Sequence, residues 1–159
     1  MKTKRLINSS GRFTRAIFLL FTMLIPGFSN AQVLTKHKWE NRLLLVLTDD
    51  TSNGKYQDQL QEFKKNLDGI KERKLLIYQI TPEKFKLGFE NSKWKKSETV
   101  YQQFKKTDSQ PEIILIGLDG GVKLQVPEFL SAKKLFATID VMPMRIQEIN
   151  RMKNTQNSK

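Results

Sequence analysis

The apolar residues of this chain fall into short continuous runs with polar turns between them. Three such runs occupy residues 43–48, 73–80 and 113–116. Runs of this length are too short for an ordinary helix, and continuous apolar character is typical of a strand covered on both faces. The pattern therefore predicts three buried strands.

The segment between the first two strands has the periodicity of a helix. Its apolar residues recur at steps of four, three and four, at Tyr56, Leu60, Phe63 and Leu67, which places them on one helical face. Turn-forming residues 49–54 precede it, and Gly69 with Ile70 is expected to end it. Two buried strands joined by a helix predict a parallel β-α-β unit with a right-handed crossover. A weaker helix is expected later, over residues 94–104.

The second half of the chain predicts an antiparallel hairpin followed by helices. The third strand leads into the turn Asp119–Gly121 and a return strand at 122–126. Ser131 is a good N-cap for the next helix, and Pro143 suits the first turn of a last short helix. The order β-α-β-α-β-β-α predicts an α/β fold of the thioredoxin-like kind, with a four-stranded mixed sheet and flanking helices.

The first 31 residues have the three-part pattern of a secretory signal peptide. Five basic residues precede an uncharged apolar run at 16–25, and Pro26–Gly27 breaks this run shortly before Ala31. The run would span about 15 Å as a helix, against about 30 Å of hydrocarbon in a bilayer. We therefore expect cleavage near Ala31 rather than a membrane anchor, and a protein that is exported to the periplasm or secreted.

Removal of residues 1–31 would leave the length of one ordinary domain. We expect the folded domain to cover residues 32–153, without a transmembrane helix, and residues 154–159 to form a disordered polar tail. The precursor has a formal charge of +12. Five of its 28 basic residues and none of its 16 acidic residues lie in the leader, so the mature charge is +7. The chain has no cysteine, which excludes thiol chemistry and disulfide bonds.

Four segments carry a resemblance to a known family. NRLLLVLTDD, ERKLLIYQI, IILIGLDGGVKL and LFATIDVMPMRIQEI, in this order and at these spacings, resemble the domain of unknown function 4174 family. The resemblance covers nearly all of Trp39–Met152. It implies a thioredoxin-like fold, distantly similar to peroxiredoxins and related to modules of animal sushi-repeat extracellular-matrix proteins. It implies no particular activity. The candidate family-motif positions are Arg42, Asp49, Asp50, Pro111, Asp119, Gly120, Asp140, Pro143 and Arg145.

The resemblance also fixes where a redox cysteine would lie. Thioredoxins and peroxiredoxins carry it just after the first strand or at the start of the next helix, because a helix N-terminus lowers the pKa of a thiol. Here that position is Thr48–Asn53, where no residue can form a sulfenate or a disulfide. A serine or threonine there would need a base. His37, the one histidine, is expected to be an exposed residue before the first strand. No catalytic residue, metal or cofactor follows from the sequence.

The aspartates of this turn carry two further interpretations. Asp49 and Asp50 would form a hard-cation site if Asp119 joined them at one edge of the sheet. They would instead serve an unorthodox hydrolase or oxidoreductase that also uses Thr51 and Arg145. Adjacent aspartates lack the D-x-D spacing of aspartate phosphatases, and the favoured interpretation is that both carboxylates cap the turn and the helix.

Residues 84–106 combine lysines with aromatic side chains. The lysines are Lys84, Lys86, Lys93, Lys95, Lys96, Lys105 and Lys106, and the aromatic residues are Phe85, Phe89, Trp94, Tyr101 and Phe104. Such a segment is able to grip a polyanion, for example a single-stranded nucleic acid or an anionic glycan. Helical spacing favours the simpler interpretation, in which the aromatic residues form an inner face and the lysines an outer one.

Two motifs near the end of the chain have a structural interpretation. Asp140 and Arg145 straddle a helix break and are expected to pair, with Arg42 nearby, as a latch between elements. Pro111 stands just before the third strand, where thioredoxins place a cis-proline beside their substrate groove. By resemblance it would be cis, but few X-Pro bonds in folded proteins are, so the sequence leaves the isomer open.

The sequence therefore favours an exported, cysteine-free thioredoxin-like domain that binds an unidentified protein or envelope component. The alternatives are the unorthodox enzyme built on the Asp49–Thr51 turn and a basic polyanion-binding protein.

Overall fold

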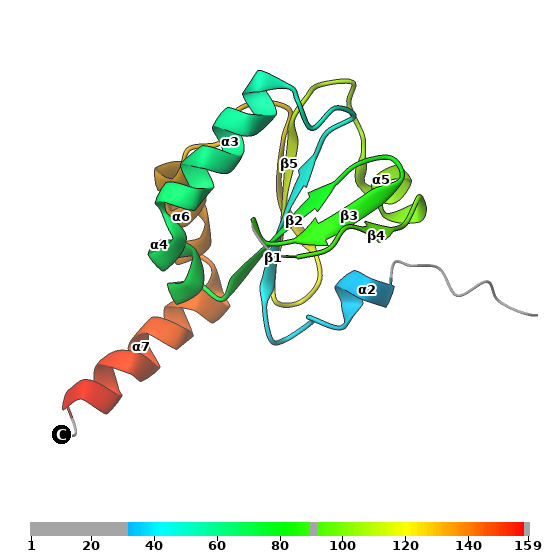
Figure 1. Cartoon of the computed structure of the whole chain (residues 1–159). Coiled ribbons are helices and arrows are strands. Elements are labelled where there is room, and N and C mark those ends of the chain that lie inside the picture. The colour runs from blue at the N-terminus through cyan, green and yellow to red at the C-terminus, as the bar shows by residue number, and fades with distance from the viewer. Residues whose placement is uncertain (1–31, 90–91, 158–159) are drawn as a thin grey trace, which may run out of the picture.

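The structure is a computed structural model that describes residues 32–89 and 92–157 (Figure 1). The predicted signal peptide, residues 1–31, lies outside the described residues. A mixed sheet forms the centre of the described part of the chain, with the strand order β4-β3-β2-β1-β5-β6. Its strands are β1 (Arg42–Leu47), β2 (Leu75–Ile80), β3 (Lys84–Leu87), β4 (Lys95–Lys96), β5 (Glu112–Ile116) and β6 (Val122–Val126).

The strand pairing confirms the predicted thioredoxin-like core and adds to it. β1 and β2 are parallel, and β5 and β6 form the expected antiparallel hairpin beside β1. The sheet has two strands more than predicted, because β3 and β4 continue it antiparallel at the β2 edge. β4 begins inside the segment expected to be helical, so helix α5 covers only Thr99–Phe104. β4 and β3 have only two and four residues, and an apolar–polar pattern this short cannot be distinguished from that of a loop in the sequence.

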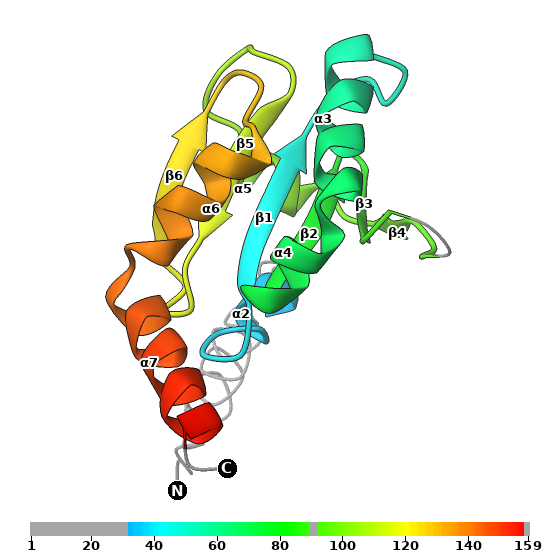
Figure 2. The same ribbon diagram turned by 90° about the vertical axis from the view of Figure 1, so that its left-hand side faces the viewer.

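Helices cover both faces of the sheet (Figures 1 and 2). One face carries α3 (Gly54–Lys65), α4 (Leu67–Glu72) and α6 (Ala132–Asp140), and the other carries α5 and α2 (Gln32–Thr35). Strand β1 is buried along its whole length and contributes to both cores, because alternate side chains point to opposite faces. Leu44 and Val46 join the first core, and Leu43, Leu45 and Leu47 join the second.

Gly69 does not end the helix that follows β1, contrary to the prediction. α3 ends at Lys65, and Gly69 lies inside the next helix, α4. The ring of Phe136 from α6 lies against it, and a Cβ atom built on Gly69 would come 2.5 Å from Phe136 Cε2. This glycine therefore permits a close contact between α4 and α6, which sequence periodicity does not reveal.

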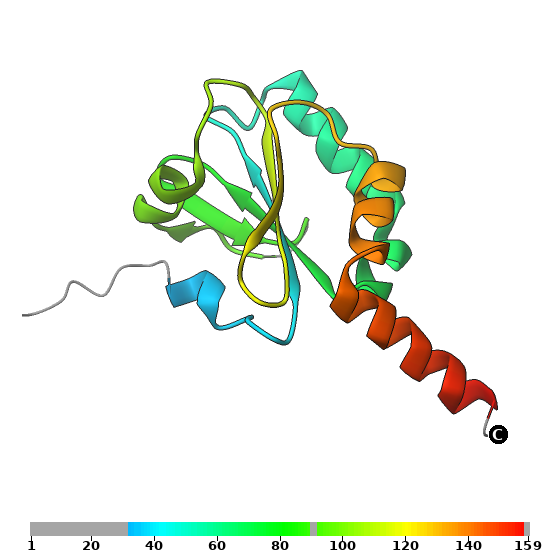
Figure 3. The same cartoon turned by 180° about the vertical axis from the view of Figure 1, so that it is seen from behind.

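Helix α7 (Pro143–Asn157) is longer than the short helix predicted and extends away from the sheet (Figure 3). It begins at Pro143, as expected. Arg145 is its buried residue, whereas the apolar residues Ile146 and Met152 are 45% and 44% exposed. The helix continues past residue 154, where a disordered tail was expected to begin.

Helix α6 begins at the predicted N-cap. Ser131 Oγ accepts a hydrogen bond from Lys134 N at 3.3 Å, which confirms this N-cap.

No helix within residues 32–89 and 92–157 is long and apolar enough to cross a membrane.

We predict that Gly69→Val lowers the free energy of unfolding by about 1–3 kcal/mol, because the added side chain overlaps the Phe136 ring. Urea denaturation followed by circular dichroism measures the change. Phe136→Leu removes the ring atoms that the valine meets. The double variant should therefore lose less stability than the sum of the two single variants. Strict additivity would contradict the close contact between α4 and α6.

Candidate functional site

The candidate site predicted from the sequence lies at the carboxyl end of β1, where the chain turns into α3. Thr48 Oγ1 donates to the Asp50 carbonyl oxygen at 2.8 Å. The Asp50 carboxylate accepts from Ser52 N at 2.8 Å and from Ser52 Oγ at 2.7 Å. Asn53 Oδ1 caps α3 by accepting from Tyr56 N at 3.3 Å. These side chains are therefore engaged in forming the turn and the helix start.

Asp49 is held by two other elements. The hydroxyl of Tyr101 from α5 donates to one carboxylate oxygen, and the side-chain amide of Gln110 donates to the other. Gln110 Oε1 accepts in return from Asp49 N at 3.3 Å and lies 3.2 Å from Thr48 Oγ1. The Gln110–Pro111 peptide bond is cis, the isomer that the resemblance implied. Asp50 thus caps the turn, as the favoured interpretation predicted, whereas the Asp49 carboxylate binds Tyr101 and Gln110 and Asn53 caps the helix.

The hydrogen bonds of the turn affect the basicity of Asp50. Hydrogen bonds from Ser52 hold the pKa of Asp50 below its ordinary value, which makes Asp50 a weaker base. His37 stands before β1, at the opposite end of the strand. It is half-buried rather than exposed, and its Nε2 lies 2.7 Å from the Tyr78 hydroxyl. Burial lowers its pKa. The hydroxyl groups of the turn therefore have no histidine beside them.

The structure adds a buried acid that the sequence analysis missed, Glu112, directly after Pro111. Its side chain is fully buried, accepts from the Gln125 amide and from two backbone N–H groups of the preceding loop at 3.2 Å, and pairs with Lys105 at 3.8 Å. Burial raises the pKa of Glu112, but the hydrogen bonds and Lys105 outweigh burial and hold it below its ordinary value. In the sequence, the sign of this buried acid is a single acidic residue at the start of an otherwise apolar strand. Glu112 anchors the loop that carries Gln110.

Asp119 does not join the two aspartates of the turn, so the alternative of a hard-cation site built from these three residues is not formed. β1 and β5 are antiparallel, and the turn after β5 therefore lies at the opposite end of β1 from Asp49–Asp50. Asp119 pairs with Lys123 at 2.7 Å, and Gly120 has the positive φ of 79° that this turn requires. The described residues contain no group of three acidic or histidine side chains placed to hold a metal ion.

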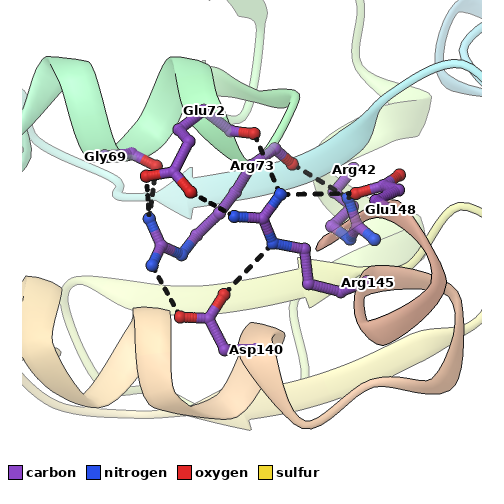
Figure 4. Close-up of polar contacts among 7 residues, drawn as sticks. All are labelled: Arg42, Gly69, Glu72, Arg73, Asp140, Arg145 and Glu148. Carbon is purple, nitrogen blue, oxygen red and sulfur yellow. Dashed lines mark hydrogen bonds and ion pairs between the residues drawn. The ribbon is translucent and has the colours of Figure 1, made fainter. Parts of the chain in front are cut away.

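The other motif positions meet in a cluster of charged side chains at the amino end of β1 (Figure 4). We call it the arginine cluster, and it consists of Arg42, Glu72, Arg73, Asp140, Arg145 and Glu148. These residues come from β1, the end of α4 and the residue after it, α6 and α7. Arg145 therefore lies far from the Asp49–Thr51 turn with which the enzyme interpretation combined it.

Arg145 and Asp140 pair as expected. Arg145 is 2% exposed, and its Nε lies 3.2 Å from Asp140 Oδ1. It also pairs with the Glu72 carboxylate and donates to the Glu72 carbonyl oxygen at 3.3 Å. Burial alone would lower the pKa of Arg145, but its pairs with Asp140 and Glu72 raise it. Asp140 also accepts from Arg73 Nη2 at 2.6 Å, so α6 is tied to the start of β2.

Arg42 is the most deeply buried member, with 1% of its surface exposed. Its Nη1 lies 3.2 Å from Glu148 Oε2 and donates to the Arg73 carbonyl oxygen at 3.0 Å. Its Nε and Nη2 atoms have no hydrogen-bond partner among the described residues. Glu148 also reaches Arg145 Nη1 at 3.7 Å. Glu148 therefore joins both buried arginines to α7, and the cluster acts as the predicted latch.

The seven lysines do not form the outer face of one helix, contrary to the simpler interpretation. Lys84 and Lys86 lie on β3, Lys95 and Lys96 form β4, and Lys93 precedes β4. Lys105 forms an ion pair with the buried Glu112, and the neighbouring Lys106 is exposed. The strands β3 and β4, with the residues between Ser92 and Lys96, therefore form a lysine-rich ribbon at the edge of the sheet.

Hollows open on the surface beside the turn. One of about 680 Å³ lies between α3 and β3, and its lining includes Thr51, Tyr56, Gln79, Lys86 and Trp94. One of about 450 Å³ lies beside Pro111, and its lining includes Lys55, Pro127 and Phe129. A smaller one of about 310 Å³ lies at the turn itself and is lined by Asp49, Asp50 and Thr51.

Comparison with known proteins agrees with this fold. A sequence profile of the family described as Domain of unknown function (DUF4174) matches residues 33–148. The chain belongs to the DUF4174 family. The matched range ends at Glu148, so it contains the whole arginine cluster of this DUF4174 protein. No curated protein matches the chain.

A solved structure extends the comparison to the fold. The reduced 2-Cys peroxiredoxin of Plasmodium vivax has a TM-score of 0.50 and 14% sequence identity, and the alignment covers 74% of this chain and 84% of that one. At this identity the likeness shows the thioredoxin-like fold alone. The name of that protein specifies two cysteines, whereas the DUF4174 protein has none.

We predict that Glu148→Gln lowers the free energy of unfolding by about 3 kcal/mol, because it leaves the buried Arg42 without its carboxylate partner. Denaturant titration measures the change. Glu98→Gln is the matched control, since Glu98 is exposed and makes no side-chain cap bond, and it should stay within about 0.5 kcal/mol of the parent. Equal stability of the two variants would show that the cluster does not hold α7.

Proposed function

We propose that this DUF4174 protein is an exported binding module that does not carry out catalysis. The observation that supports this proposal is the turn after β1. Thiol enzymes of the thioredoxin-like kind place their nucleophile there, because the helix start stabilises a thiolate. In this chain the turn has no cysteine, and Asp50, Ser52 and Asn53 are hydrogen-bonded within it.

The remaining polar groups of the turn support the same proposal. Asp49 is bound by Tyr101 and Gln110, so its carboxylate is occupied by the protein's own donors. A catalytic carboxylate needs a free oxygen within hydrogen-bond reach of its substrate. The hollows beside the turn, in contrast, offer exposed surface with mixed polar and apolar character, which is what a binding site requires.

The leader supports the exported location of the module. Residues 1–31 combine a basic start, an apolar core of ten residues and small residues before Gln32. An exported domain without cysteine relies on burial and ion pairing for its stability, and the two apolar cores and the arginine cluster supply both.

The non-catalytic role predicts a specific result for Asp49→Ala. The purified protein should turn over no peroxide, disulfide, ester or phosphate substrate, and Asp49→Ala should not change this. The variant should lose about 1 kcal/mol of stability, because Tyr101 and Gln110 lose their acceptor. Enzyme assays and denaturant titration measure the two effects. An activity that disappears in Asp49→Ala but persists in the control Asp108→Ala, another exposed aspartate, would support the enzyme instead.

The exported location predicts a defined mature end. When the full chain is expressed with its own leader in a Gram-negative host, mass spectrometry of the periplasmic fraction should find a protein that starts at Gln32. Ala31→Arg should block the cut, because the cleavage site needs a small residue. Recovery of the uncut chain from the cytoplasm in both cases would contradict export.

A further inference from the structure

The hollow between α3 and β3 has a rigid floor. Tyr56 and Gln79 are both buried there, and the Tyr56 hydroxyl donates to Gln79 Oε1 at 2.6 Å. The Gln79 side-chain amide in turn donates to the Gly88 carbonyl oxygen at 2.5 Å. Burial raises the pKa of Tyr56, so its phenol stays protonated as the donor. These bonds fix the loop that follows β3 against the sheet.

One wall of the hollow is an aromatic ring with two lysines close to it. The ammonium groups of Lys84 and Lys86 lie 5.2 Å and 5.1 Å from the centroid of the Trp94 ring, within the range of cation–π attraction. Lys86 Nζ also donates to the Phe89 carbonyl oxygen at 3.2 Å. Trp94 therefore presents a positioned apolar face beside two fixed positive charges.

Strand register gathers three lysines on this side of the ribbon. Lys84 pairs directly with Lys96, and Lys86 pairs with Gln79 of the floor. Directly paired residues and residues two apart on a strand point to the same face. Lys84, Lys86 and Lys96 therefore face α3, whereas Phe85 points into the opposite core. Like charges directly opposite one another destabilise a strand pair, and an anion bound between them would remove that cost.

Two simpler roles explain less of this arrangement. Lysines on an edge strand prevent pairing with other chains, but that role does not require Trp94 to lie between them or a hollow behind them. Single-stranded nucleic acid binds by stacking successive bases on several aromatic side chains. Phe85, Tyr101 and Phe104 pack in the opposite core, so they do not form such a platform with Trp94. Phe89 lines the hollow with Trp94 but is partly buried against the first core, which leaves Trp94 without a series of stacking partners.

We propose that this groove binds an acidic oligosaccharide. A sugar ring packs on Trp94, and its acidic groups pair with Lys84, Lys86 and Lys96. Lys86 and Trp94 line the hollow, and Lys84 and Lys96 lie beside it on the ribbon. Gln57 and Gln61 of α3 line it as well, and their amides match the donors and acceptors of sugar hydroxyls. The volume of about 680 Å³ is in the range of small-ligand sites. This inference rests on the proposed function and names its class of ligand.

The test measures binding of a heparin-derived tetrasaccharide to the full-length mature protein by isothermal titration calorimetry. Binding should weaken at least about tenfold between about 0.05 M and about 0.5 M NaCl, because salt screens the lysines. Trp94→Ala should weaken it by a similar factor at low salt. Lys84→Glu should abolish it while raising the urea midpoint, because the like-charged pair with Lys96 becomes an opposite-charged one. If Lys84 had only a structural role, the Lys84→Glu variant would not lose binding while its urea midpoint rises.

Lys133→Glu is the matched control, because it changes the net charge equally on an exposed position of α6, and it should alter the affinity less than about twofold. The inference is overturned if the tetrasaccharide does not bind. It is also overturned if Lys84→Glu and Lys133→Glu weaken binding alike, or if an oligothymidine binds more tightly than the tetrasaccharide. Any of these results leaves the proposed function standing, since that is judged by turnover and the Asp49→Ala variant.

Discussion

The structure depends on the burial of β1 on both faces and both edges. Its side chains alternate into two cores, while its backbone pairs with β2 on one side and β5 on the other. Such a strand cannot shift by one residue without exchanging its two faces. The two ends of β1 are therefore fixed in space. Arg42 at the amino end belongs to the arginine cluster, and Thr48 beyond the carboxyl end belongs to the closed turn.

The two ends serve different purposes. At the amino end, buried charges from four segments hold α6 and α7 against the sheet, and each buried arginine has a carboxylate partner distant in sequence, Glu148 for Arg42 and Glu72 for Arg145. At the carboxyl end, the turn that suits a reactive thiolate in thioredoxin-like enzymes is closed by its own hydrogen bonds. The fold thus keeps its scaffold, and the surfaces beside the turn remain open to a ligand.

How much the sequence predicts depends on how local each interaction is. The strands β1, β2 and β5 are predictable from their continuous apolar runs, because burial on both faces requires apolar side chains throughout. The Asp140–Arg145 pair is predictable from its spacing, but Glu72 and Glu148 join it through tertiary contacts. β3 and β4 form by pairing at the edge of β2, a tertiary contact that their short sequences do not indicate. The role of Gly69 likewise depends on its contact with Phe136, which is distant in sequence. The groove at Trp94 is equally non-local, since helical spacing in residues 94–104 suggested a different arrangement.

The central claim is that ligand binds beside Trp94 while Asp49 and Asp50, the aspartates of the turn after β1, take no part. An NMR titration of the isotope-labelled protein with the heparin tetrasaccharide tests it most directly. The chain has two tryptophans, and Trp39 is an internal control because it is 61% exposed and has Lys38 5.4 Å from its ring. We predict a saturable shift of the Trp94 indole signal, with Trp39 and the amides of residues 48–50 unchanged, since Thr51 itself lines the hollow. Shifts centred on residues 48–50 or on Trp39 would contradict the account.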